Sequence, residues 1–191
     1  MSVRFILGGA RSGKSRYAQE LAARLGRRVL YVATAEALDE EMNSRIEAHK
    51  KSRPFTWRTL EAQTDVAKAI SSEIGDAEVV VLDCLTLLIS NLRGRDSTDI
   101  ETWEKRVTAE LETLISLMEV TPSHFIIVSN EVSLGLVPPN PLGRAYRDIL
   151  GLANQMLAKH AEEVYFMVAG IPIPLKGRTC SSEGGLSLER G

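Results

Sequence analysis

"FILGGARSGKSRYAQELA", residues 5–22, joins a short apolar run to a glycine-rich turn and then to a helical pattern. The turn fits the phosphate-loop pattern G-x-x-x-x-G-K-[ST] at every fixed position, and it stands where that loop must, after a strand and before a helix. A nucleotide-binding loop at the start of an α/β sheet is therefore predicted. Its residues are Gly8, Gly9, Ala10, Arg11, Ser12, Gly13, Lys14 and Ser15.

The fixed positions of this loop have separate physical tasks. Gly8 and Gly13 allow backbone angles and close approaches that a Cβ atom would forbid. Lys14 is expected to reach the β- and γ-phosphates, and Ser15 to offer its hydroxyl to Mg²⁺. Asp83 ends the apolar run "EVVVLD" and is the expected acidic partner of that Mg²⁺. The alternative for Asp83 is a cap on the segment that follows the strand.

Strand-like and helical patterns alternate along the chain, which predicts a mainly parallel sheet with helices on both faces. The expected fold class is α/β, a P-loop NTPase of the RecA-like three-layer type with a C-terminal edge hairpin. The last strand contains Pro172 and Pro174 and should lie at the edge. Strands are expected at 3–7, 28–34, 55–60, 78–83, 124–130, 163–170 and 171–176. Helices are expected from Lys14, at 38–52, 65–74, about 99–120 and about 142–161.

Composition limits the function classes. The 191 residues are 44% hydrophobic and 25% charged with a net charge of −2, so no basic excess points to nucleic acid or to an anionic membrane. The longest apolar stretch, at 79–89, is shorter than the roughly 18–20 residues of a membrane helix. Cys84 and Cys180 fit no metal motif and predict free thiols in a reducing cytoplasm. One domain is expected at 1–176, followed by a loose, glycine-rich tail at 177–191.

The predicted helix at 38–52 carries a histidine among its apolar positions. With Leu38 at zero and about 100° per residue, His49 falls at about 20°, between Leu38 and Met42. His49 therefore faces the body of the protein. Five cations lie near it in the sequence, against the single acid Glu47: Arg45, Lys50, Lys51, Arg53 and Arg58.

Two interpretations of His49 are open at this point. It is either a packed histidine near a helix end that favours cations, or a nucleophilic imidazole beside a triphosphate. In the second case the cations would stabilise charge on phosphorus and depress the imidazole pKa, keeping the attacking neutral form. Spacing alone favours the packed histidine. His124 and His160 lack such surroundings and are interpreted as structural.

Longer stretches of the chain resemble the bifunctional adenosylcobinamide kinase / adenosylcobinamide-phosphate guanylyltransferase family of cobalamin biosynthesis. The resemblance runs in order over about residues 3–176. Its most specific parts are "R-I-x-x-H-K…R-P…W-x-T", "N-E-V…G…V-P" and "R-D-I-x-G-x-x-N-Q". They lie in the segments "YVATAEALDEEMNSRIEAHKKSRPFTWRTLEA" and "VSNEVSLGLVPPNPLGRAYRDILGLANQML".

The resemblance implies two consecutive reactions. A nucleoside triphosphate, ATP or GTP, phosphorylates adenosylcobinamide, and GTP then gives GMP to that phosphate through a GMP–histidine intermediate. The family histidine falls on His49, which reverses the preference stated above. Family members form homotrimers, and Mg²⁺ accompanies the nucleotide. The family's nucleotide-site positions fall on Thr34, Lys50, Lys51, Ser52, Arg53, Glu61 and Asp83.

The residues themselves favour the same edge. Thr34, Glu61, Asp83 and Asn130 stand at or just past the carboxyl ends of predicted strands, where open α/β sheets bind ligands. Asp83 and Glu61 are both candidate bases for the kinase step.

The chain departs from the family pattern at Ser133, where many members have glycine. This substitution bears on the geometry of the loop at 131–141, and this loop is either a contact for the corrinoid or a neighbouring subunit, or an ordinary connection.

Two other functions compete with this interpretation. One is a P-loop kinase of another small metabolite, in which His49 is merely packed. The other is a RecA-like module whose nucleotide hydrolysis drives association with a partner. The absence of a basic stripe with interleaved aromatic residues argues against DNA as that partner.

Overall fold

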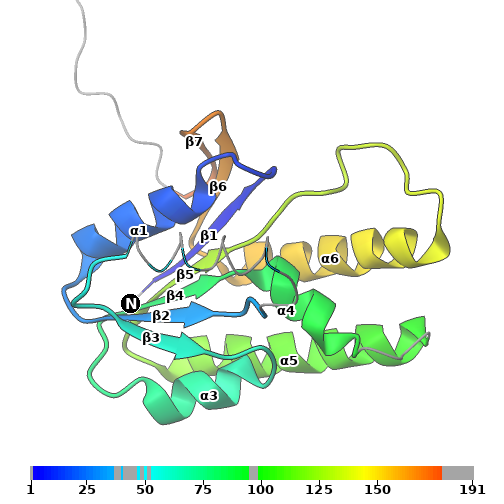
Figure 1. Ribbon diagram of the computed structural model, residues 1–191. Coiled ribbons are helices and arrows are strands. Elements are labelled where there is room, and N and C mark those ends of the chain that lie inside the picture. Colours follow the sequence, from blue (N-terminus) through cyan, green and yellow to red (C-terminus); the bar gives the residue numbers. More distant parts are fainter. Residues whose placement is uncertain are drawn as a thin grey trace, which may run out of the picture.

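The chain forms a seven-stranded sheet with helices on both faces (Figure 1). The structure is a computed structural model that describes residues 2–36, 40, 47, 50, 53–94 and 99–177. The strand order is β3-β2-β4-β5-β1-β6-β7, in which all neighbours are parallel except the β6–β7 hairpin. One strand, β5, separates the strand that leads into the phosphate loop from the strand that ends at Asp83. The predicted fold class is confirmed.

Most element bounds follow the predicted ones closely, but β3 begins at Arg58 instead of at residue 55, and α4 was not among the expected helices. The strands are β1 (Val3–Gly8), β2 (Val29–Ala33), β3 (Arg58–Glu61), β4 (Val79–Asp83), β5 (His124–Val128), β6 (Glu163–Val168) and β7 (Ile171–Lys176). The described helices are α1 (Lys14–Leu25), α3 (Val66–Glu73), α4 (Leu85–Leu92), α5 (Ile100–Val120) and α6 (Pro141–His160). Of the predicted helix at 38–52, the structure describes Glu40, Glu47 and Lys50, which are helical.

Two unequal hydrophobic layers hold the sheet. On one face, α3, α4, α5 and α6 pack around large buried side chains such as Phe5, Trp103 and Phe125. On the other face, α1 packs through Ala18 and Ala22 against the opposite sides of the same strands. Figure 1 shows α1 on one side of the sheet and α3 and α5 on the other. Because the central strands are buried on both faces, β2 and β4 are apolar nearly throughout.

Two of the helices on the larger face, α5 and α6, begin at side-chain caps. Asp99 accepts hydrogen bonds from the backbone N–H groups of Glu101 and Thr102 at the start of α5. Asn140 accepts from Gly143 N–H at the start of α6, whose first residue is Pro141. Both arrangements satisfy N–H groups that a helix start leaves without an intrahelical partner.

The sheet ends at β7 as its prolines predicted. Pro172 and Pro174 stand opposite Met167 and Tyr165 of β6. A proline has no N–H to donate, so it is tolerated on an edge strand, where no strand on the outer side needs that hydrogen bond. No helix in the described part of the chain is long and apolar enough to cross a membrane. The predicted tail at 177–191 lies outside the described residues except for Gly177.

Candidate nucleotide site

The phosphate loop is built around two glycines in conformations that other residues avoid. Gly8 has φ 153° and Gly13 has φ 93°. A Cβ atom on Gly8 would lie 2.6 Å from the carbonyl oxygen of Met167, and one on Gly13 would lie 3.2 Å from Cα of Gly170. Gly13 immediately precedes α1, whose first turn carries no acidic side chain. The loop therefore brings backbone N–H groups and a helix N-terminus to one point, which suits a phosphate.

A pair of glycine substitutions tests whether the loop has room for a Cβ atom at Gly8 and at Gly9. Gly8→Ala should lower the free energy of unfolding by about 1–3 kcal/mol, because the added methyl group meets a backbone carbonyl. Gly9→Ala is the matched control, since a Cβ atom there meets nothing within 4 Å. Urea unfolding of the two variants without nucleotide makes the comparison. Equal midpoints for both would contradict the tight contact at Gly8.

Lys14 is held inside the loop by neutral oxygen atoms. Its Nζ donates to the carbonyl oxygen of Gly9 at 2.6 Å and lies 3.5 Å from Ser12 Oγ. The side chain is buried, and desolvation lowers the pKa of Lys14, opposed by the charge of Asp83. A buried ammonium group with weak neutral partners is ready to exchange them for phosphate oxygens.

A hairpin turn supports the loop from the side. The β6–β7 turn has φ 50° at Ala169 and φ 83° at Gly170, and Gly170 N–H donates to Ser12 O at 3.0 Å. Sequence reasoning missed this support. A short Ala-Gly connection between two strands was the available signal, because Gly tolerates positive φ in such turns.

Asp83 ends β4 at the same edge of the sheet as the phosphate loop. It stands opposite Ala33 of β2 and Val128 of β5. Its Oδ2 accepts a hydrogen bond from the hydroxyl of Tyr31 at 2.5 Å. Burial, followed by the charge of Asp83, raises the pKa of Tyr31 far above its usual value, so this hydroxyl stays a donor. The structure thus brings Lys14 and Asp83 within electrostatic reach of each other, as predicted.

The donor set at this edge fits Mg²⁺ bound together with a nucleotide. Mg²⁺ prefers oxygen ligands and is usually held by one or two protein groups plus phosphates and water. The Ser15 hydroxyl and the Asp83 carboxylate are such groups. Among the described residues no cluster of three or more His, Cys, Asp or Glu side chains could bind a metal alone. The site therefore suits a metal that arrives with phosphate.

Two cations from the segment around position 49 reach this edge. Lys50 Nζ lies 2.9 Å from Glu61 Oε1 at the carboxyl end of β3, and this pairing raises the pKa of Lys50. The Arg53 guanidinium carbon lies 3.8 Å from the centre of the Tyr31 ring. His49, Lys51 and Ser52 lie outside the described residues, as does Arg45.

Thr34 has a structural task that the resemblance did not indicate. It is fully buried, and its hydroxyl donates to Cys84 O at 2.7 Å and accepts from Cys84 N–H at 2.9 Å. Its own carbonyl accepts from Asn91 Nδ2 at 2.8 Å. Thr34 therefore fixes the chain just after Asp83. A contact between this residue and a nucleotide stays a prediction that the engaged side chain does not support.

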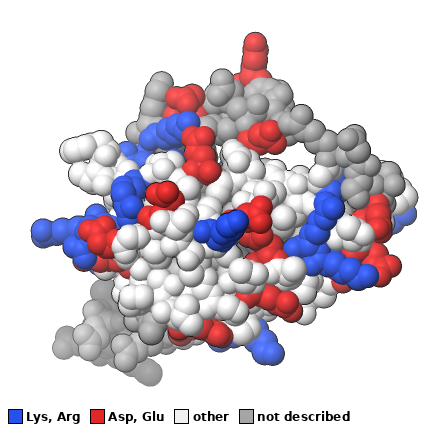
Figure 2. Space-filling view, turned by 90° about the horizontal axis from the view of Figure 1, so that it is seen from below, with Lys and Arg blue, Asp and Glu red and all other residues white. Residues whose placement is uncertain are grey.

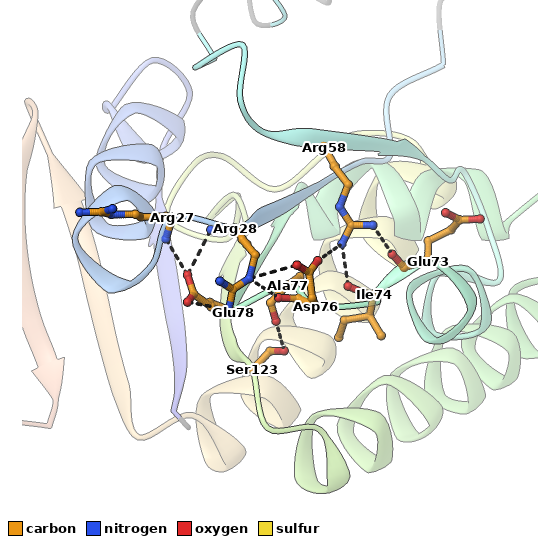
Figure 3. Close-up of polar contacts among 9 residues, drawn as sticks. All are labelled: Arg27, Arg28, Arg58, Glu73, Ile74, Asp76, Ala77, Glu78 and Ser123. Carbon is orange, nitrogen blue, oxygen red and sulfur yellow. Dashed lines mark hydrogen bonds and ion pairs between the residues drawn. The ribbon is translucent and has the colours of Figure 1, made fainter.

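Arg58 does not belong to a cationic group at the phosphate edge, and that expectation is wrong. Figure 3 shows its guanidinium turned toward the end of α3, where Nη1 donates to Glu73 O at 2.9 Å and Nη2 to Ile74 O at 2.7 Å. Asp76 Oδ1 lies 3.7 Å away. Arg58 begins β3, so its side chain satisfies helix carbonyls at the amino edge of the sheet. Sequence proximity to His49 could not indicate this, because it does not tell at which end of β3 the Arg58 side chain stands.

The other two histidines also lie away from the phosphate loop. His124 begins β5 at the amino edge, and its Nδ1 is 2.9 Å from Ser2 Oγ. Burial lowers the pKa of His124. His160 ends α6, with Nδ1 3.6 Å from Glu119 Oε1. Neither position conflicts with a structural role.

Cys84 has the environment of a packed thiol. Burial and the neighbouring Asp83 raise the pKa of Cys84 to about 11. About one thiol in a thousand is then ionised at pH 8, and only the thiolate is nucleophilic. In a Cys180→Ser background, native protein should react with a disulfide reagent such as DTNB far more slowly than guanidinium-unfolded protein does. Equal rates in the two states would contradict this description of Cys84.

The loop at 131–141 leaves the sheet directly beside the phosphate loop. Glu131 N–H donates to Gly8 O at 3.0 Å. The backbone N–H of Ser133 donates to Glu131 Oε1 at 2.5 Å, and the Ser133 hydroxyl donates to the same oxygen. Ser133 is not among the described residues with positive φ, so serine is unstrained at this position. Farther along, Leu134, Leu136 and Val137 are largely exposed.

Asn154 of α6 anchors the start of that loop and was not singled out from the sequence. It is buried, and its Oδ1 accepts from Ser129 Oγ at 2.8 Å while its Nδ2 donates to Asn130 O at 3.2 Å. Asn130 N–H donates in turn to Thr86 Oγ1 at 2.8 Å. The family pattern "N-Q" at 154–155 was the signal that could have found it.

The described surface does not gather charge of one sign beneath α3 and α5. Figure 2 shows that face with Lys and Arg side chains beside Asp and Glu side chains. On α5, Lys105 Nζ lies 2.6 Å from Glu101 Oε1. A surface of this kind has no continuous basic track for a phosphate backbone.

Known proteins resemble the chain over nearly its whole length. A family model described as cobinamide kinase / cobinamide phosphate guanyltransferase matches residues 4–175. The bifunctional adenosylcobalamin biosynthesis protein CobU of Escherichia coli is 40% identical over 178 residues, covering 90% of this chain and 98% of that protein. The corresponding protein CobP of Pseudomonas aeruginosa is 45% identical over 172 residues, covering 90% and 96%. A crystal structure of the RadB recombinase superposes with a TM-score of 0.48 at 15% identity, covering 86% of this chain and 73% of that one.

Proposed function

This chain belongs to the cobinamide kinase / cobinamide phosphate guanyltransferase family, and from that premise we propose that it carries out both family reactions at one nucleotide site. It phosphorylates adenosylcobinamide with ATP or GTP. It then transfers GMP from GTP to the new phosphate, giving adenosylcobinamide-GDP in cobalamin biosynthesis. The observation that carries the proposal is the edge shared by the phosphate loop, Lys14, Asp83 and two cations that follow position 49, Lys50 and Arg53.

In the kinase reaction the chain mainly positions the nucleotide phosphates and neutralises their negative charge. The loop N–H groups and the start of α1 bind the phosphates, and Lys14 moves from Gly9 O to the β- and γ-phosphate oxygens. Ser15 and Asp83 would hold Mg²⁺, which supplies charge neutralisation at the transferring phosphoryl group. The alcohol needs a base, and the two candidates at this edge are Asp83 and Glu61. Asp83 accepts a hydrogen bond from Tyr31, and Glu61 forms an ion pair with Lys50.

In the guanylyl transfer His49 is the nucleophile. A ring nitrogen attacks the α-phosphorus of GTP, the bond to the β-phosphate bridging oxygen breaks, and pyrophosphate leaves. A phosphate oxygen of the corrinoid then attacks the same phosphorus, and the nitrogen–phosphorus bond breaks. Two displacements retain configuration at phosphorus. Support comes from Lys50 and Arg53, which follow position 49 in the chain and reach the edge, with Lys51 and Ser52 assigned to the same nucleotide surface.

Product analysis tests the proposal and separates it from its competitors. Purified protein is incubated with adenosylcobinamide and ATP or GTP, and the corrinoids are identified by mass. The proposal requires adenosylcobinamide phosphate first and adenosylcobinamide-GDP when GTP is present. Nucleotide turnover without any corrinoid product would contradict it. A kinase of another metabolite would transfer the γ-phosphate to that metabolite and not to the corrinoid. A RecA-like module would hydrolyse nucleotide faster when its partner molecule is added.

The assembly and its cell compartment are part of the same proposal. We expect a homotrimer in the cytoplasm. Light scattering should give about three times the 21.0 kDa mass of one chain. A monomeric mass in active protein would contradict the trimer and leave the chemistry untouched.

A further inference from the structure

Tyr31 connects the interior of the sheet to the carboxylate at its edge. It is 1% exposed and lies on the α1 face, together with Ala33 and Val81. In the parallel pairing of β2 with β4, Tyr31 stands opposite Val81, and Ala33 stands opposite Asp83. Side chains two residues apart on a strand share a face. The phenol therefore reaches one pleat forward along that face, and its hydroxyl donates to Asp83 Oδ2 at 2.5 Å.

The same ring is the platform for a cation from the segment after position 49. The Arg53 guanidinium carbon lies 3.8 Å from the ring centre. Trp57 stacks against Tyr31 with ring centres 6.4 Å apart and planes at 27°. Arg53 Nε and Nη1 are buried and have no hydrogen-bond partner among the described residues. In the described part of the chain, the guanidinium interacts with Tyr31, through the ring that lies beneath it and through the phenol hydroxyl.

We propose that Tyr31 is a positioning residue, which orients the Asp83 carboxylate for Mg²⁺ through its hydroxyl and docks Arg53 through its ring. The inference rests on the proposed function, since Asp83 as a Mg²⁺ partner belongs to that function. A hydrogen bond to one carboxylate oxygen fixes the side-chain torsion and leaves the other oxygen for the cation. One buried residue then positions both Asp83, the proposed Mg²⁺ ligand, and Arg53, a proposed nucleotide contact in guanylyl transfer.

Tyr31→Phe removes the hydroxyl and keeps the ring. The direct readout is the gain in GTP affinity when Mg²⁺ replaces EDTA, measured by calorimetry without catalysis. We expect this gain to shrink roughly tenfold or more in Tyr31→Phe, in line with the loss of a hydrogen bond to a charged group. GTP affinity in EDTA and the thermal midpoint should stay close to wild type. In activity assays, both reactions should need more Mg²⁺ for half-maximal rate, while the rate at saturating Mg²⁺ largely recovers.

Tyr165→Phe is the matched control. The Tyr165 hydroxyl donates to Glu163 Oε2, also at 2.5 Å, but on β6 and away from the phosphate edge. This variant loses the same kind of bond and should keep the wild-type Mg²⁺ gain. An equal loss in Tyr165→Phe and Tyr31→Phe would overturn the positioning role.

Asp83→Asn separates failure of the inference from failure of the proposed function. If Asp83→Asn loses the Mg²⁺ gain while Tyr31→Phe keeps it, the inference is overturned and the metal assignment stands. If Asp83→Asn keeps the gain, the metal assignment of the proposed function fails, and the inference fails with it. The double variant should lose no more than Asp83→Asn alone, because both changes act through one carboxylate. Additive losses would overturn the inference.

Discussion

Lys14→Ala should lose nucleotide binding and both activities together. The ammonium group is buried and donates to Gly9 O, a neutral acceptor, so anionic phosphate oxygens are much stronger partners for it. Charge-assisted hydrogen bonds of this kind are each worth roughly 1.5–3 kcal/mol. GTP affinity, measured by calorimetry with Mg²⁺, should therefore fall by about a hundredfold or more.

Lys176→Ala is the control for this variant. Lys176 Nζ also donates to backbone carbonyl oxygens, those of Ala158 and Lys159, but at the end of β7 away from the phosphate loop. Its loss should leave GTP affinity unchanged. GTP affinity close to wild type in Lys14→Ala would remove the phosphate loop from the account.

His49→Asn should abolish guanylyl transfer and spare the kinase reaction. An amide cannot form the covalent bond to phosphorus, and removing a catalytic nucleophile costs roughly four orders of magnitude in rate or more. Conversion of adenosylcobinamide to its phosphate should continue, because that reaction uses Lys14 and the γ-phosphate. Chromatography of the two corrinoid products separates the activities in one incubation.

His124→Asn and His160→Asn are the matched controls, since both histidines lie outside the phosphate edge. Both variants should keep guanylyl transfer near the wild-type rate. Transfer that survives in His49→Asn, or that disappears in either control, would contradict the assignment of the nucleophile.

The fold was predictable because its signals are local and agree with one another. Apolar runs such as the one that became β4 alternate with helical periods, and Pro172 and Pro174 identify an edge strand. The boundary error at β3 has a physical reason. Residues 54–57 form a turn in which Trp57 N–H donates to Pro54 O, so the strand begins at Arg58 instead of at residue 55.

The candidate site was predictable only where a residue type at a fixed spacing carries the chemistry. The phosphate loop and Asp83 are such cases, and the structure brings them to one edge. The parts that support them were not predictable. Tyr31 looks like any buried strand residue, and the contact of Gly170 with the phosphate loop depends on a turn more than 150 residues away in the chain.

Arg58 shows the opposite failure, in which a residue near the motif in sequence lies at the far edge in space (Figure 3). The turn at residues 54–57 makes Arg58 the first residue of β3, and this puts its side chain at the amino edge of the sheet.

One labelling experiment reaches the central claim, that an imidazole at position 49 carries GMP between the two substrates at the phosphate-loop edge. Protein is incubated with Mg²⁺ and GTP labelled with ³²P at the α-phosphorus, freed of nucleotide, and then given adenosylcobinamide phosphate. The account predicts an acid-labile, base-stable label on the peptide that contains His49, and its transfer to the corrinoid on the second addition. Protein that stays unlabelled while still producing adenosylcobinamide-GDP, or a label that the corrinoid phosphate does not remove, would contradict it.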